Sequence, residues 1–286
     1  MDSYTNSFEQ ERPALVAIAY QMLGERSAAQ DLVQDAWEIW NQADKASIDS
    51  PAAWLRRVTS RLAIDELRSA RKKREVYVGP WLAEPILDDA QTEPEAQFAL
   101  AKDCELALMW AMERLSEEER SAFILRKVFE SDYSELSSLL GKSEASCRKI
   151  VSRASSRIAD TKLKFNITPE ETGLLLEKFS KACASLNHDE VLSLMAPDVV
   201  SVSDGGGGVR AALRTLHGAD EVTSVLLSIL RKQRLDNAIE VAMVNGQPAI
   251  VVSGSEQQNM VLTICADDVG RIAWIYIMRN PDKLGF

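Results

Sequence analysis

Residues 115–158 read LSEEERSAFILRKVFESDYSELSSLLGKSEASCRKIVSRASSRI, and this stretch decides the fold of the middle of the chain. Three residues in it are of the type that caps helix N-termini. They are Ser116, Asp132 and Ser143. Gly141 is placed to end the second helix, and the third helix is expected to cover Glu144–Ile158. A short helix, a glycine turn and a longer helix are typical of a helix-turn-helix.

The third helix is expected to turn a polar and basic face to solvent, with Ala145, Cys147, Ile150, Val151 and Ala154 inward. In a helix-turn-helix, the N-terminal side chains of this helix read base edges, and the later basic ones hold phosphates. The candidate DNA-binding residues are Ser143, Glu144, Ser146, Arg148, Lys149, Ser152 and Arg153. The alternative is an ordinary helical bundle with a solvated basic face, and the pattern alone leaves both open.

The total charge argues against DNA binding, but its distribution favours it. The 286 residues contain 33 Lys and Arg against 43 Asp and Glu, a net charge of -10. Residues 56–74 nevertheless carry +6 and residues 141–164 carry +5, whereas residues 75–105 hold eight acids and one lysine. Two cationic helical stretches inside an acidic protein are a better indication of nucleic-acid binding than the total.

The periodicity predicts three structural parts. Apolar residues spaced three and four apart over residues 8–74 indicate a helical bundle, and residues 98–164 are helical again. Between them, the proline-containing acidic stretch 76–97 is a linker. After Pro169 the pattern changes to helices followed by strands. The helices are expected at 170–186 and 219–232, and the strands at 238–244, 249–253, 260–266 and 271–278. The fold class is therefore multidomain, two all-α domains followed by an α+β domain.

Composition excludes several classes of protein. The four cysteines are scattered without C-x-x-C spacing and there are two histidines, which argues against a zinc site, another metal site or a disulfide framework. The N-terminus lacks the basic and apolar regions of a signal peptide, and no stretch of about 18 apolar residues occurs. We therefore expect a reduced, soluble, cytoplasmic protein with no membrane contact and no cofactor.

The first half of the chain resembles region 2 of extracytoplasmic-function (ECF) sigma factors of the sigma-70 family. The resemblance rests on residues 31–40 (DLVQDAWEIW), 51–58 (PAAWLRRV) and 62–74 (LAIDELRSARKKR). Residues 113–160 then resemble region 4. This resemblance implies an alternative sigma factor that directs core RNA polymerase to specific promoters. The implied domains are region 2 at 1–75, the linker and first helix of region 4 at 76–112, region 4 at 113–165 and a C-terminal domain at 166–286.

The resemblance also implies roles for individual residues. Region 2 docks on the clamp helices of the polymerase β′ subunit and opens the −10 element, and region 4 reads the −35 element next to the β flap. The polymerase-binding candidates are Asp31, Leu32, Gln34, Asp35, Trp37, Glu38 and Trp40. The −10 candidates are Asn41, Trp54, Arg56, Arg57, Arg61, Asp65 and Arg68. For the three tryptophans, core packing is favoured over base stacking. For Arg71–Arg74, the simplest interpretation is a solvated helix end that also suits phosphate contact.

The C-terminal domain is similar to a SnoaL-like (NTF2-like) α+β cone, and three motifs indicate the ECF subgroup that carries one. The motif residues are Trp81, Leu82, Glu84 and Pro85 in the linker, Asp204, Gly205, Gly206 and Gly207 in the tail, and Asn280, Pro281, Asp282, Lys283 and Leu284 near the end. Ala83 and Gly208 depart from the Pro and Lys that the family usually has. The resemblance implies regulation in cis by intramolecular contact with the sigma domains. Without it, a flexible glycine loop and a frayed terminus are the simpler interpretations.

A competing hypothesis is an enzyme or ligand sensor fused to a DNA-targeting helical module. Some SnoaL-like relatives are isomerases or cyclases with an Asp/His pair, and the candidates here are Asp204, His188 and His217. A general base needs a positioned group with a perturbed pKa, which the sequence does not indicate. Both histidines are expected at helix ends. We therefore expect no catalysis, and prefer an unknown small ligand in the cone as the second possibility.

Overall fold

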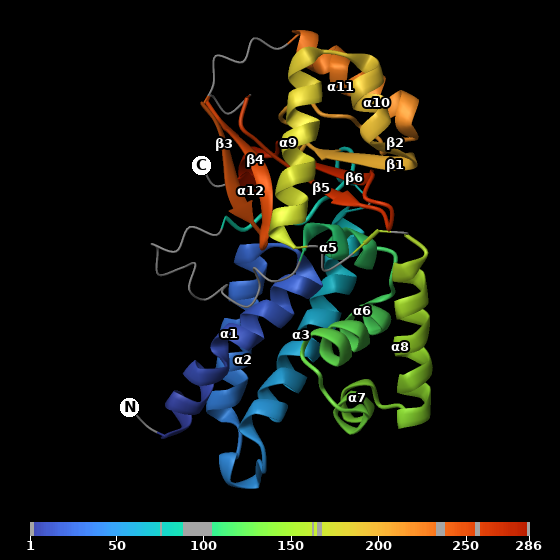
Figure 1. Cartoon of the computed structure of the whole chain (residues 1–286). Helices are drawn as coiled ribbons and strands as arrows, with labels where there is room; N and C mark the ends of the chain where they lie inside the picture. Colours follow the sequence, from blue (N-terminus) through green and yellow to red (C-terminus); the bar gives the residue numbers. More distant parts are fainter. Residues whose placement is uncertain are drawn as a thin grey trace. The chain divides into compact units, whose positions relative to one another are not determined.

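The computed structural model describes residues 3–74, 76–87, 105–161, 163–164, 168–232, 238–254 and 258–284 (Figure 1). Its described residues form two compact units. The first unit comprises residues 3–74 and 109–161, and the second comprises residues 76–87, 105–108 and 163–284. The linker residues 76–87 therefore belong to the unit that contains the C-terminal domain.

The first half of the helical unit is a bundle of three long helices. Helix α1 covers Ser3–Leu23, α2 covers Arg26–Gln42 and α3 covers Pro51–Arg74, with a short 3-10 turn η1 at Lys45–Ser47. Helix α1 packs against both α2 and α3. The apolar residues spaced three and four apart form the core, as the sequence predicts, with the exception of Ile39, which is exposed. The fully buried members include Phe8, Leu15, Ile18, Tyr20, Trp40 and Leu55.

The second half of the helical unit contains the predicted helix-turn-helix. After α5 (Leu106–Met112), the elements are α6 (Glu117–Phe123), the π-helical turn η2 (Ile124–Val128), α7 (Tyr133–Leu140) and α8 (Glu144–Ala159). All three predicted caps are confirmed, because the side chains of Ser116, Asp132 and Ser143 accept backbone hydrogen bonds from the first turns. Gly141 ends α7 with a φ of 61°, which a residue without a Cβ adopts freely.

A shared hydrophobic cluster joins the two halves of this unit. Ile18 of α1 belongs to the same buried cluster as residues of α6, η2, α7 and α8. The other members are Ala122, Leu125, Leu136, Cys147, Ile150 and Val151. Cys147, Ile150, Val151 and Ala154 are buried as predicted, whereas Ala145 is exposed, because it lies in the first turn of α8 beyond the edge of this cluster. The helix-turn-helix is thus packed against the N-terminal bundle within one unit.

The second unit is a sheet covered by helices. It contains α9 (Pro169–Ser185), α10 (His188–Leu194), β1 (Met195–Asp204), β2 (Leu216–His217), α11 (Ala219–Lys232), β3 (Ala238–Val244), β4 (Gln247–Ser253), β5 (Met260–Ala266), β6 (Ile272–Met278) and α12 (Pro281–Leu284). The strand order is β2-β1-β6-β5-β4-β3. Strands β1 and β6 pair in parallel, and the other neighbours pair antiparallel. Helix α9 lies across β4 and β5, and α11 lies against β1 (Figure 1).

The fold class is confirmed, but the sequence interpretation misses α10 and β1 and misplaces His217. Strand β1 carries Pro197, has a register shift between Met195 and Val200, and buries Ser201 and Ser203. Such a strand shows no simple alternation of apolar and polar residues. His217 lies in the short edge strand β2, and His188 is the first residue of α10, whose N-cap is Asn187. Among the described helices, none is both long and apolar enough to span a bilayer.

Candidate DNA and polymerase interfaces and the linker site

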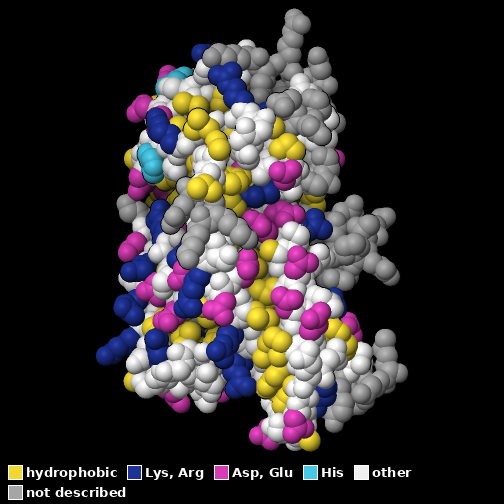
Figure 2. Space-filling model, turned by 180° about the vertical axis from the view of Figure 1, so that it is seen from behind, with side chains coloured by type: hydrophobic (Ala, Val, Ile, Leu, Met, Phe, Trp, Pro, Cys, Tyr) yellow, Lys and Arg dark blue, Asp and Glu magenta, His cyan; other side chains and the backbone are white. Residues whose placement is uncertain are grey.

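The solvent-facing side of α8 carries the residues predicted to bind the −35 element. All seven are exposed, and six of the seven residues that line an open groove of about 620 Å³ are polar or basic. The groove is lined by Lys142, Ser146, Arg148, Lys149, Ile150, Ser152 and Arg153. In Figure 2, dark-blue Lys and Arg side chains line the surface on the side where α8 lies. A convex helix with this chemistry suits the edges and phosphates of a DNA groove.

Most of the −10 candidates on α3 are exposed, whereas Arg56 is half-buried in an ion pair. Arg57, Arg61, Asp65 and Arg68 are exposed at spacings of three and four, so they share one face of the helix. Arg68 pairs with Asp65 at 3.2 Å. Arg56 instead forms an ion pair with Glu11 of α1 at 3.1 Å.

The tryptophans near this face pack wholly or partly in the hydrophobic core. The half-buried Trp54 lies with its ring centroid 5.4 Å from that of the fully buried Trp40. Asn41, at the end of α2, is exposed. Core packing, the interpretation favoured from sequence, describes Trp40 completely and Trp54 in part.

The polymerase-binding candidates on α2 divide in the same way. Four polar members are exposed: Asp31, Gln34, Asp35 and Glu38. Leu32 and Trp40 are buried in the bundle core, and the half-buried Trp37 packs against Phe8 at 4.8 Å between ring centroids. The apolar spacing places Ile39 with the inward residues of this helix, and that placement is wrong, because Ile39 is 39% exposed on the acidic face. Its position four residues after Asp35 was the available signal.

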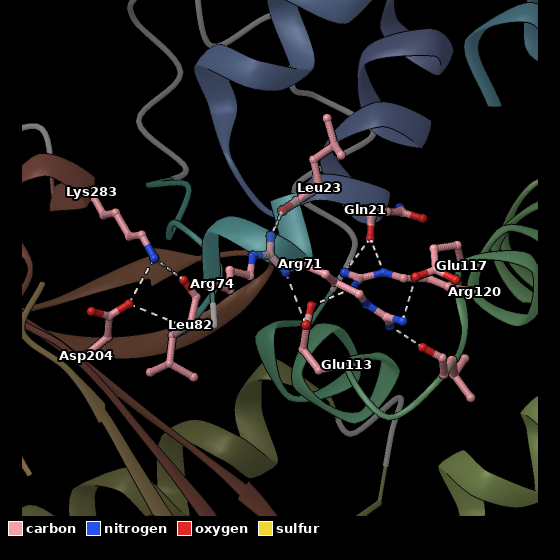
Figure 3. A network of polar contacts seen from close by, with 11 residues as sticks. Gln21, Leu23, Arg71, Arg74, Leu82, Glu113, Glu117, Arg120, Asp204 and Lys283 are labelled. Carbon is pink, nitrogen blue, oxygen red and sulfur yellow. Dashed lines mark hydrogen bonds and ion pairs between the residues drawn. The ribbon is translucent and has the colours of Figure 1, made fainter. Parts of the chain in front are cut away.

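The basic end of α3 is not a solvated helix end. The Arg71 guanidinium donates to the Glu117 carboxylate at 2.8 Å, and Arg74 donates to Glu113 at 3.1 Å (Figure 3). Arg74 also donates to the Leu23 carbonyl at 2.6 Å. The interpretation of Arg71 and Arg74 as free cations is therefore wrong, because acidic residues about 40 positions later in the chain fold against them.

Arg120 completes this network. Its side chain is fully buried, donates twice to the Gln21 carbonyl at 3.0 and 2.8 Å, and pairs with Glu113 (Figure 3). Burial alone would raise the pKa of Glu113, but the charges of Arg120 and Arg74 and the hydrogen bond from Arg120 outweigh it and leave that pKa lowered. A carboxylate thus holds two buried guanidinium groups together.

A second polar network lies inside the other unit, around Asp204. The Asp204 side chain is fully buried at the end of β1 and accepts hydrogen bonds from the Tyr77 hydroxyl at 2.5 Å, from the Leu82 amide at 3.0 Å and from the Gly206 amide at 3.0 Å. The Lys283 ammonium lies 2.9 Å from the same carboxylate (Figure 3). One carboxylate therefore ties the linker to both the glycine loop and α12.

The Lys283 ammonium is enclosed by the linker. It donates to the Leu82 carbonyl at 2.7 Å and lies 4.3 Å from the ring centroid of Trp81 and 5.2 Å from that of Tyr77. The aromatic faces stabilise a cation that burial would otherwise penalise. The predicted motif residues Trp81, Leu82, Asp204 and Lys283 are thus brought together.

Three contacts that sequence reasoning missed extend this attachment. The Ile86 amide donates to the Asn245 side chain at 2.8 Å, and the Asn245 amide donates to the Ile86 carbonyl at 2.9 Å. The Tyr276 hydroxyl donates to the Ala83 carbonyl at 2.8 Å. Asn245 stands in a turn and Tyr276 in a strand, so neither position stands out in the sequence.

The glycine loop and the C-terminal motif meet at Asn280. The Asn280 amide donates to the Tyr77 hydroxyl at 2.9 Å. A Cβ on Gly206, whose φ is 62°, would lie 2.6 Å from the Asn280 Oδ1 atom, so this close approach requires glycine. A Cβ on Gly208 would meet nothing within 4 Å, so the site of the Lys-to-Gly departure faces open space.

The remaining motif residues lie around the same site. Pro85, Gly205 and Leu284 are buried, Glu84 and Pro281 are half-buried, and Gly207 and Asp282 are exposed. Gly207 approaches the linker, because a Cβ on it would lie 3.2 Å from the Val78 Cβ. The residues of all three motifs therefore surround one linker attachment.

Among the described residues, a small internal space lies beside Thr172, near the N-terminal end of α9. The space there has a volume of about 10 Å³, room for one water molecule at most. Glu105, Leu106 and Ala107 of the chain's own α5 region help to line it. Of the catalytic candidates, Asp204 has both oxygens in contact with the linker, and His188 and His217 are exposed.

Comparison with known proteins relates the two halves of the helical unit to one family. A Sigma-70 region 2 family model matches residues 8–73, and a Sigma-70 region 4 family model matches residues 105–158. The chain is 33% identical to the ECF RNA polymerase sigma factor SigJ of Mycobacterium tuberculosis, over 97% of this chain and 92% of that protein. It is 28% identical to the probable ECF sigma factor SigI of the same species, over 99% and 95%. The SigJ crystal structure has a TM-score of 0.78 at 31% identity, covering 98% of this chain and 97% of that one.

Proposed function

Because the chain belongs to the ECF RNA polymerase sigma factors, we propose that its region 4 reads the −35 element through α8 and its region 2 opens the −10 element through α3. The observation that carries this proposal is the face of α8, where all seven predicted residues are exposed and basic side chains line a groove. On α3, Arg57, Arg61 and Arg68 supply the cationic face that a separated strand needs.

Core polymerase binds to the acidic face of α2 in this proposal. Asp31, Gln34, Asp35 and Glu38 are the exposed polar residues, and Ile39 adds an exposed apolar side chain among them. Polar and charged residues around an apolar contact correspond to the polar rim of a protein interface. We assign this face to the β′ clamp helices and region 4 to the β flap. The protein works in the cytoplasm, where the polymerase is.

The C-terminal domain regulates the factor in cis by holding the linker, and it has no enzymatic role. The linker joins region 2 to region 4, and its residues 77, 82, 83 and 86 are hydrogen-bonded to the sheet domain. The enzyme hypothesis is not favoured, because both oxygens of Asp204, its one carboxylate candidate, are hydrogen-bonded to the linker.

Reversing the charge of Arg148 and Lys149 tests the proposal. With both changed to Glu, we expect promoter affinity of the reconstituted holoenzyme to fall by about 100-fold or more, because two attractive contacts become repulsive. The measurement is footprinting and run-off transcription on a promoter fragment selected from random DNA with the wild-type holoenzyme. The matched control reverses Lys178 and Lys181, two exposed residues of α9. Retained protection of the −35 region in the α8 variant would contradict the assignment.

A further inference from the structure

The side chain of Arg148 on α8 is held by residues on both helices of the helix-turn-helix. Its guanidinium carbon lies 4.8 Å from the ring centroid of Tyr133, the first residue of α7. Its Nη2 atom pairs with the Glu144 carboxylate at 2.8 Å, one turn earlier on α8. The side chain is nevertheless 55% exposed, so it is oriented without being buried.

The Tyr133 ring is itself fixed in place. It is half-buried and packs against the hydrophobic cluster beneath α7 and α8. A second guanidinium, that of Arg126, lies 5.1 Å from the same ring centroid. Arg126 also donates to the Glu130 and Ser131 carbonyls, both at 3.2 Å, and so holds the loop before α7, in which Glu130 has a φ of 53°. The ring is thus packed against the cluster and contacted by two guanidinium groups.

We propose that Tyr133 is a positioning residue for promoter recognition, which orients Arg148 so that the guanidinium edge faces DNA. An aromatic ring engages the face of a guanidinium and leaves the N–H donors along its edge free for a bidentate acceptor. In the free protein the Glu144 carboxylate takes that edge. On DNA, a guanine edge or a phosphate presents the same acceptor geometry and replaces the carboxylate.

The benefit of the ring is entropic as well as electrostatic. An arginine side chain loses considerable rotamer freedom when it binds, and a side chain that is already ordered loses less. Because a ring of this kind works through Arg148, its effect must vanish when Arg148 is absent. That dependence separates a positioning role from a direct DNA contact or a purely structural role. The inference rests on the proposed placement of α8 on the −35 element.

A double-mutant cycle on the holoenzyme tests this inference. The variants are Tyr133→Leu, Tyr133→Phe and Arg148→Ala, together with the Tyr133→Leu/Arg148→Ala pair. The probe is the promoter fragment selected from random DNA, and thermal unfolding checks the fold of each variant. We expect Tyr133→Leu to weaken binding about five- to tenfold, which corresponds to ~1.0–1.4 kcal/mol. Tyr133→Phe keeps the ring and should stay within about twofold of wild type.

The effect of Tyr133→Leu in the absence of Arg148 distinguishes a positioning role from the alternatives. In Arg148→Ala, which itself should weaken binding about fivefold or more, adding Tyr133→Leu should change affinity by less than about twofold. An undiminished effect of Tyr133→Leu in that background would overturn the positioning role and leave the proposed function intact. No effect of Arg148→Ala would instead remove the placement of α8, and this inference with it. Failure of Tyr133→Phe to retain binding would also count against an action through the ring face.

Discussion

Replacing Asp204 by Asn is expected to release the linker from the C-terminal domain and to increase amide hydrogen exchange in residues 77–87 by about 100-fold or more. The substitution keeps the shape of the side chain but removes its charge, and the buried Lys283 ammonium loses the carboxylate that lies 2.9 Å from it. Breaking one partner of a buried pair costs about 3–5 kcal/mol. Since about 1.4 kcal/mol corresponds to a tenfold change in an equilibrium constant, local opening becomes at least 100 times more frequent.

The control for this variant is Asp282→Asn, which removes an acidic charge next to Lys283 from an exposed position. It should leave exchange in the linker unchanged. The double variant Asp204→Asn/Lys283→Met removes both charges and should recover part of the protection, because no uncompensated ammonium remains. Wild-type exchange in Asp204→Asn would show that the ion pair does not hold the linker.

Release of the linker should also raise transcription, because the linker limits how far region 2 and region 4 can separate. A stretch of 17 residues, the length of residues 88–104, spans at most about 60 Å when fully extended at 3.3–3.6 Å per residue. With the linker free, residues 76–104 reach about 100 Å. The −10 and −35 positions lie about 25 base pairs apart, roughly 85 Å along the duplex. Equal run-off transcription from Asp204→Asn and wild type would contradict regulation by this attachment.

Local patterns predicted the helix-turn-helix, whereas the pairings within the two polar networks could not be predicted. A cap such as Ser143 bonds to a residue three positions later, so its whole interaction lies within a short window of sequence. Arg74 meets Glu113 and Tyr77 meets Asp204 only after the chain has folded, across 39 and 127 positions. The family motifs identified Asp204 and Lys283 as important, but not that one is the counter-ion of the other.

The sequence also could not assign every candidate residue to the exposed or the buried side of its helix. On α8 the helical period separates the outward residues from the buried ones, and the predicted DNA face is exposed throughout. On α2 the motif includes both sides of the helix, so Leu32 and Trp40, assigned to the polymerase by resemblance, lie in the core. Charge alone could not separate Arg56, paired with Glu11, from its exposed neighbour Arg57.

Replacing Glu113 by Gln should cost the helical unit about 3–5 kcal/mol of unfolding free energy at neutral pH, because the fully buried Arg120 and the half-buried Arg74 lose the carboxylate that they share. Arg120 is fully buried, and its charge and that of Arg74 repel each other once the carboxylate is neutral. The measurement is urea unfolding of the full chain. The matched control is Glu144→Gln, which removes an exposed pair with Arg148 and should cost less than about 1 kcal/mol.

The pH dependence gives this prediction a second, independent test. The pKa of Glu113 in the folded protein lies below its ordinary value of 4.5, so its stabilising effect is fully present above pH 4.5 and is lost as the pH falls through the folded-state pKa. A glutamine does not titrate, so the difference in stability between wild type and Glu113→Gln should shrink steadily below pH 4.5. A constant difference across that range would mean that the carboxylate charge does not hold Arg74 and Arg120. Because Arg74 directly follows the region 2 match at residues 8–73 and Arg120 lies in the region 4 match, the same loss would ease the separation of these two regions on polymerase.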